Sequence, residues 1–175
     1  MKNLLLIILF LVSASTTIYA ETAEEYLKNG TISYKQGNLL QAISDYTKAI
    51  EINSQYAAAY SARAVAYSNQ NNPTLAISDL NEAIKINPNF AEAFDFRGIV
   101  YGIQLNKIDQ AISDLNKAIE IDPKFANAYF SRGNMYIATN EYDKALADLQ
   151  KAEELGSTVN PVIMSALKKK ISSKK

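Results

Sequence analysis

The chain has 175 residues, with 18 lysine and arginine residues against 18 aspartate and glutamate residues, and it contains no histidine, cysteine or tryptophan. The missing residue types exclude disulfides, cysteine or histidine catalysis and zinc sites built from nitrogen or sulfur ligands. The balanced charge disfavours a nucleic-acid partner, which would require a strongly basic surface.

The first 20 residues have the layout of a secretory signal peptide. A short positive start precedes an apolar run from Leu4 to Val12, and small and polar residues follow as far as Ala20. The apolar run is too short for a membrane-spanning helix, which needs about 20 residues. We predict cleavage after Ala20, with a cut after Ser15 as the alternative, and an exported protein that is periplasmic or secreted. A buried first helix is the other interpretation.

An internal repeat organises the rest of the chain. The string that starts at Ala42 recurs at Ala76 and Ala111, and more loosely at Ala145, with offsets of 34, 35 and 34 residues. The extra residue of the third unit is predicted to lie in the turn at 105–107, because loops absorb insertions. These offsets define four units, residues 23–56, 57–90, 91–125 and 126–159.

Each unit predicts two helices. The first carries an aromatic residue at position 4, a small residue at position 8 and usually tyrosine at position 11, which share one face at about 100° per residue. The second carries alanine at positions 20 and 27 and a tyrosine or leucine at position 24, so that small residues let the two backbones approach. Pro88 and Pro123 end two of the second helices.

The period, the helix pairs and these positions together resemble the tetratricopeptide repeat family. The resemblance covers residues 23–159 and implies an all-α, right-handed superhelical solenoid of four antiparallel helix pairs. The predicted organisation is a signal peptide at 1–20, a repeat domain at 21–159, and a capping helix with a basic tail at 160–175.

The C-terminal segment is predicted to close the solenoid. Asn160 is the expected cap of a helix that starts at Pro161, and its apolar strip would consist of Val162, Ile163, Ala166 and Leu167. Five lysines lie in the last eight residues. We interpret them as a solvated terminus, with weak contact to an anionic membrane as the alternative.

The resemblance implies that positions 2, 5, 9, 12 and 13 of each first helix line a concave groove that binds a protein or peptide. Asparagine amides there can hold an extended backbone, while apolar side chains contact its side chains. The other interpretation is that these residues are simply tolerated at the surface. Among the residues at these positions, those predicted to contact the partner are Leu27, Thr31, Tyr34, Ser61, Val65, Asn69, Glu92, Asp95, Ile99, Asn127, Phe130 and Asn134.

One subfamily of these repeats holds the acidic tail of heat-shock chaperones with lysine and asparagine at set groove positions. This chain has Leu27 and Thr31 at two of those positions, and Glu92 with Asp95 would repel a carboxylate. A co-chaperone role is therefore disfavoured. Glu92 and Asp95 are also the only paired carboxylates suggestive of acid–base chemistry, a weak signal. We predict no catalytic residue, no metal and no cofactor.

Arginine recurs at position 7 in three units and aspartate at position 23 in all four. We interpret them as ion pairs that fix the orientation of the repeats, because position 7 lies on the packed face; a charged track for a ligand is the alternative. Each arginine can reach the aspartate of its own unit or of the preceding one. The residues are Arg63, Arg97 and Arg132, with Asp45, Asp79, Asp114 and Asp148.

These observations predict a non-catalytic interaction scaffold whose groove binds a partner. The alternative is a structural part of an envelope assembly that acts through its convex face and basic tail. Residues 21–167 carry 12 basic against 18 acidic residues, a net charge of −6. Charge-driven contacts of the body would therefore favour basic partners. The oligomeric state is not predicted.

Overall fold

The computed structural model describes residues 21–173, and the predicted signal peptide lies outside them. The described part of the chain is helical and contains no strand. No helix within it is long and apolar enough to span a membrane. The helices are α2 (Ala23–Lys35), α3 (Leu39–Ile52), α4 (Ala57–Asn69), α5 (Pro73–Ile86), α6 (Ala91–Ile99) continued by the π-helix η1 (Val100–Gln104), α7 (Ile108–Ile121), α8 (Ala126–Ala138), α9 (Tyr142–Glu154) and α10 (Pro161–Ser172).

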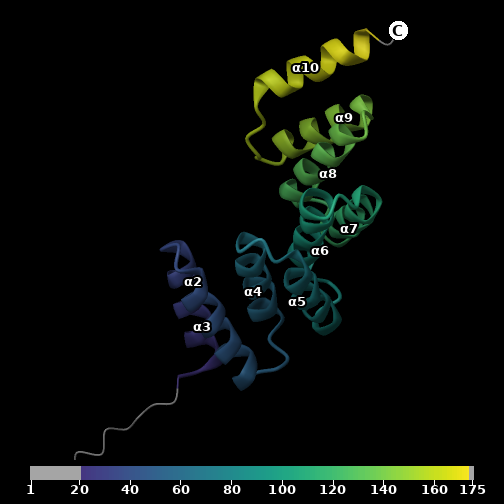
Figure 1. The fold of residues 1–175 in the computed structure, drawn as a ribbon. Coiled ribbons are helices and arrows are strands. Elements are labelled where there is room, and N and C mark those ends of the chain that lie inside the picture. Colours follow the sequence, from purple (N-terminus) through teal and green to yellow (C-terminus); the bar gives the residue numbers. More distant parts are fainter. Residues whose placement is uncertain (1–20, 174–175) are drawn as a thin grey trace, which may run out of the picture.

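The helices pair in sequence order and the pairs stack one after another, with α10 across the far end (Figure 1). The predicted all-α superhelical solenoid of four helix pairs and a capping helix is therefore confirmed. In such an array each unit buries its apolar face against its neighbours, so the core runs along the length of the solenoid.

Small residues bring the two helices of a pair together. Ala111, Leu115 and Ala118 of α7 have no exposed surface. Gly98 of α6 faces them, and a Cβ atom at this position would lie 2.9 Å from Leu115 Cγ and 3.0 Å from the carbonyl oxygen of Ala111. The glycine therefore allows the large leucine to fill the space between the helices.

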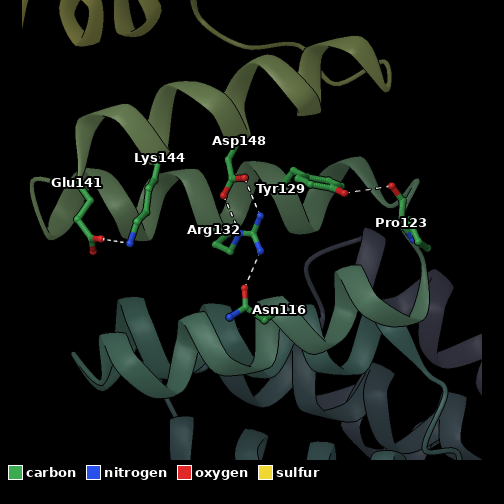
Figure 2. A network of polar contacts seen from close by, with 7 residues as sticks. All are labelled: Asn116, Pro123, Tyr129, Arg132, Glu141, Lys144 and Asp148. Carbon is green, nitrogen blue, oxygen red and sulfur yellow. Dashed lines mark hydrogen bonds and ion pairs between the residues drawn. The ribbon is translucent and has the colours of Figure 1, made fainter. Parts of the chain in front are cut away.

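Arginine side chains connect neighbouring units (Figure 2). In the fourth unit, Arg132 Nε and Nη2 donate to the two carboxylate oxygens of Asp148 at 2.7 Å, and Arg132 Nη1 donates to Asn116 Oδ1 at 2.6 Å. The aspartate belongs to the same unit, whereas the asparagine lies on the second helix of the preceding unit. The same arrangement joins Arg97 to Asp114 and Asn81, and Arg63 to Asp79 and Thr47.

We call this series the arginine ladder. Of the two pairings that the sequence allowed, the structure shows the one with the aspartate of the same unit. All three arginines are largely buried, and the hydrogen bonds to their aspartates raise the pKa of each guanidinium. The first unit has Asn29 in place of the arginine, and the 5% exposed Asp45 accepts a hydrogen bond from Gln41 instead, at 2.9 Å.

The extra residue of the third unit lies in a helix, so its predicted location in the turn was wrong. The turn at 105–107 has three residues, like those of the other units, and its middle residue Asn106 has a positive φ of 51°. The corresponding residues Gly37, Asn71 and Asn140 also have positive φ. Because this turn geometry is the same in every unit, the surplus residue is accommodated upstream as the π-helix η1.

The capping helix starts as predicted but packs through a different strip. The Asn160 side chain accepts a hydrogen bond from the Val162 backbone at 2.9 Å. Leu167 is buried, with Ile163 and Met164 beside it, against the core of the last unit. Val162 is 73% exposed. The predicted strip was therefore wrong at Val162 and Ala166, because the rotation of the helix turns both toward solvent when Leu167 faces inward.

Candidate partner-binding groove

The predicted groove residues all lie on the first helices of their units, α2, α4, α6 and α8. In the first two units, four of these six side chains make contacts within the fold. Leu27 packs into the core between α2 and α4, and Thr31 donates to the Leu27 carbonyl at 2.8 Å. Asn69 donates to the Tyr34 hydroxyl across the two units. Ser61 and Val65 are half-buried on α4.

The last two units form a pocket between α6, η1 and α8, which we call the α6–α8 pocket. Its volume is about 260 Å³. It brings together five of the twelve predicted contact residues, and also Ile103, which occupies groove position 13 of its unit. The other contact residue predicted in these two units, Glu92, is exposed outside the lining. The lining consists of Asp95, Ile99, Ile103, Asn127, Phe130, Ser131, Asn134 and Met135.

Ser131 and Met135 were missing from the predicted groove positions, because they occupy positions 6 and 10 of the unit. Both are buried, at 7% and 4% exposure. They reach the pocket because α8 packs beside α6, which turns this flank of α8 toward Asp95. The sequence did contain one indication: the two residues are four positions apart, so they lie on the same face of the helix.

Asp95 is the ionisable residue of the pocket lining, and it is only 7% exposed. Its Oδ1 atom is buried without a hydrogen-bond partner among the described residues. Burial raises the pKa of Asp95 to about 6; the Ser131 hydroxyl opposes this shift, and the nearby negative charge of Glu92 adds to it. A carboxylate with one unsatisfied oxygen in this environment is unfavourable for the fold, which makes it a candidate functional group.

The π-helix shapes one wall of the pocket. Gly102 lies so close to α8 that a Cβ atom on it would collide with Met135 Sδ. The next residue, Ile103, is 70% exposed at the pocket rim. Gln104 donates to the Ser68 hydroxyl at 2.8 Å and so ties the end of η1 to α4 of the preceding unit. The inserted residue therefore lies where the third unit meets both of its neighbours.

A second cavity of about 450 Å³ adjoins the pocket on the side of the capping helix. Asn134 lines both cavities, and Ile137 of α8 with Ile163 and Leu167 of α10 supply apolar walls. Lys170 stands at its edge. The two cavities together extend the candidate binding surface from α6 to α10.

The comparisons with known proteins agree with this architecture. The family descriptions "TPR repeat" and "Tetratricopeptide repeat" match residues 30–71 and 103–136, and residues 57–90 and 126–158, respectively. No curated protein sequence gives a significant match.

Among solved structures, "Crystal structure of MamA" is 31% identical, with a TM-score of 0.68 over 76% of this chain and 77% of that one. "First TPR of Spaghetti (RPAP3) bound to HSP90 peptide SRMEEVD" is 26% identical, with a TM-score of 0.65 over 68% of this chain and 96% of that one. A Pseudomonas aeruginosa pilF structure has a TM-score of 0.78 at 21% identity, over 86% of this chain and 69% of that one, which shows the shared fold alone. On the repeat matches and the MamA similarity, the chain belongs to the tetratricopeptide repeat family.

Proposed function

We propose that this protein is an exported, non-catalytic scaffold that binds an extended peptide segment of a partner protein along α6, α8 and α10. Membership of a family of interaction modules supports the coarse function, a protein–protein interaction scaffold. The observation that supports the location is the α6–α8 pocket, which gathers Asp95, Ile99, Asn127, Phe130 and Asn134.

The chemistry of the pocket suits a peptide. Ile99 and Phe130 offer half-buried apolar surface, and Asn127 and Asn134 each carry an amide donor and acceptor. An extended peptide can exchange backbone hydrogen bonds with such amides while its side chains occupy the apolar hollows. The volume of about 260 Å³ lies below the usual size of a small-molecule site, roughly 300–1,000 Å³, and fits a single side chain better.

Two structural neighbours carry peptides, one with the HSP90 peptide SRMEEVD and the other, the second TPR domain of human RPAP3, with the HSP70 peptide SGPTIEEVD. Both peptides end in the sequence EEVD, which carries three acidic side chains. The α6–α8 pocket of this chain carries Asp95, with Glu92 nearby. Like charges repel, so the ligand of this chain differs in charge from those acidic tails.

Truncating the groove side chains is expected to weaken partner binding without loss of helicity. Phe130→Ala removes apolar contact area and Asn134→Ala removes an amide. Each variant should therefore lower about tenfold the affinity for a partner protein that the wild-type chain captures from an envelope extract. Affinity would be measured on immobilised protein and helicity by circular dichroism. Leu75→Ala, a matched apolar truncation at a 45% exposed site of α5, should leave affinity unchanged.

Wild-type affinity in both groove variants would contradict this location. If binding then disappears on removal of residues 168–175, the envelope-assembly function through the basic tail is the better explanation. Lys168, Lys169 and Lys170 are all exposed on α10 and available for such contacts.

Export is the second part of the proposal, and residues 1–20 support it by their sequence alone. When the full-length chain is expressed and the cells are fractionated, we expect a shortened protein in the exported fraction, with its amino terminus at Glu21 or Thr16 after cleavage. A chain that lacks residues 2–20 should remain in the cytoplasm. Retention of an uncleaved full-length chain in the cytoplasm would contradict export and leave the groove proposal intact.

A further inference from the structure

We propose that the α6–α8 pocket binds a lysine side chain of the partner peptide, with Asp95 as its counter-ion. This inference rests on the proposed function, since it names the side chain that the groove would select. It goes further by assigning a chemical specificity to one pocket.

The first support is the unsatisfied oxygen. Asp95 is more than nine-tenths buried and lines the pocket, yet its Oδ1 has no hydrogen-bond partner among the described residues. A buried carboxylate normally has a cation or several donors beside it. No lysine or arginine lines this pocket. The carboxylate therefore lacks the positive partner that a ligand can supply.

The second support is the contrast with the arginine ladder. Asp79, Asp114 and Asp148 each use both oxygens to receive the fork of an arginine. Asp95 differs because the Ser131 hydroxyl already acts on its carboxylate, and the single Oδ1 is without a donor. One available oxygen suits the compact ammonium of lysine better than a planar guanidinium, which needs two parallel acceptors.

The shape of the pocket supports the same choice. A lysine has an apolar four-carbon stem that can lie against Ile99, Phe130 and Met135, while its ammonium reaches the carboxylate. Met135 is an unbranched, flexible side chain, so it can move aside to open the way to the buried oxygen. The amide oxygens of Asn127 and Asn134 can accept the remaining ammonium hydrogens.

The charge on Asp95 should make this recognition depend on pH. Its pKa of about 6 means that the carboxyl is largely protonated at pH 5 and charged at pH 7.5. The charged group that acts on it is Glu92 of the same helix, while α8 presents the uncharged Ser131 and η1 presents no ionisable lining residue. Lysine binding is therefore expected to strengthen as pH rises through about 6.

The test uses peptide mixtures on the purified protein. The probes are acetylated, amidated nonapeptides in which the central residue is fixed as lysine, arginine, methionine or glutamate and the other positions are equimolar mixtures. We expect the lysine-fixed mixture to bind about tenfold more tightly than the methionine-fixed one at pH 7.5, because a partly buried ion pair contributes that much or more. The preference should fall to about twofold or less at pH 5 and in Asp95→Asn at either pH.

Glu92→Gln is the matched control, since it changes the net charge equally on the same helix but at an exposed site outside the pocket lining. It should keep most of the lysine preference. An equal loss in Glu92→Gln and Asp95→Asn would overturn the pocket in favour of general electrostatics, and equal binding of the arginine-fixed mixture would overturn the choice of lysine.

Misfolding would not explain the expected loss. A buried carboxyl with a raised pKa destabilises the fold once it ionises above that pKa, so Asp95→Asn should have an unfolding midpoint at pH 7.5 no lower than wild type. Failure of all four mixtures to bind the wild-type protein would reject peptide binding itself. Binding that is lost in Phe130→Ala but shows no lysine preference would reject this inference alone.

Discussion

Replacing Asp114 with alanine is expected to lower the free energy of unfolding by about 3 kcal/mol, the lower end of the range for breaking a buried ion pair. Asp114 accepts two hydrogen bonds of 2.8 Å from Arg97, and the side chains of the two residues are only 10% and 18% exposed. The variant leaves the guanidinium largely buried with one remaining hydrogen bond, to Asn81. Urea denaturation monitored by circular dichroism measures the change.

Glu120→Ala is the control for this prediction. It breaks the Lys117–Glu120 pair of the same helix, whose side chains are 42% and 69% exposed. Exposed pairs contribute about 0–1 kcal/mol, so this variant should stay near wild type. If the two variants lower the free energy of unfolding equally, the buried ion pairs of the ladder stabilise the fold no more than an exposed ion pair does.

A double variant separates loss of the ion pair from loss of packing. Replacing Arg97 with methionine and Asp114 with leucine removes both charges and keeps apolar volume, so it should recover much of the stability that Asp114→Ala loses.

Leu115→Ala is expected to destabilise the protein by about 2–5 kcal/mol through the cavity it leaves. Leu115 has no exposed surface and packs with Ala111 and Met135 at the centre of the third unit. Neighbouring backbones cannot close the cavity easily, because the helices of the pair are already in close contact at Gly98. The effect would be read from the same urea transitions.

Leu40→Ala provides the comparison at an exposed site. Leu40 is 76% exposed on α3, so the same truncation should change stability by about 0.5 kcal/mol or less. A small loss of stability in Leu115→Ala would mean that the neighbouring side chains repack into the cavity. It would contradict the prediction that the space filled by position 24 of each unit cannot close.

The sequence predicted the helix pairs because their packing is encoded by residue size. Alanine at positions 20 and 27 and leucine at position 24 recur with the period of the solenoid, and in the structure Ala111, Leu115 and Ala118 are fully buried. Small and large residues at fixed spacing leave few ways to pack two helices. Single-chain periodicity was therefore sufficient for the fold.

The pairing of the arginines was not predictable from spacing alone. The aspartates of the same and of the preceding unit lie at similar sequence distances from each arginine, and both pairings satisfy three of the four aspartates. The choice depends on the crossing of the helices, which places Asp148 beside Arg132 and brings Asn116 to the third donor (Figure 2). The positions of these partners depend on how neighbouring units stack, which the sequence of one unit does not specify.

The sequence placed Asp95 among the candidate groove residues, but it did not indicate that the carboxyl group is buried. Helical periodicity placed Asp95 on an open flank, because it treats each helix in isolation. In the solenoid α8 covers this flank and buries the carboxyl against Ser131. The burial of Asp95, on which the lysine inference depends, is therefore a product of stacking.

The inserted residue could have been located from the sequence. Asn106 precedes Ala111 by the same five residues that separate Asn71 from Ala76 and Asn140 from Ala145. Each asparagine holds the positive-φ position of its turn. Aligning the units on these asparagines fixes the length of the turn and leaves the surplus residue in the helix before it.

The π-helix has a consequence for how such a chain can diversify. The ladder contacts of Arg97, before η1, and of Arg132, after it, all have lengths of 2.6–2.8 Å, so the arginine ladder continues past the inserted residue. The π-helix adds contacts of its own, from Gln104 to Ser68 and from Gly102 to Met135, and it places Ile103 at the pocket rim. A repeat array of this kind can therefore gain a new recognition surface through the insertion of one codon, while the helix pairs keep their stacking order.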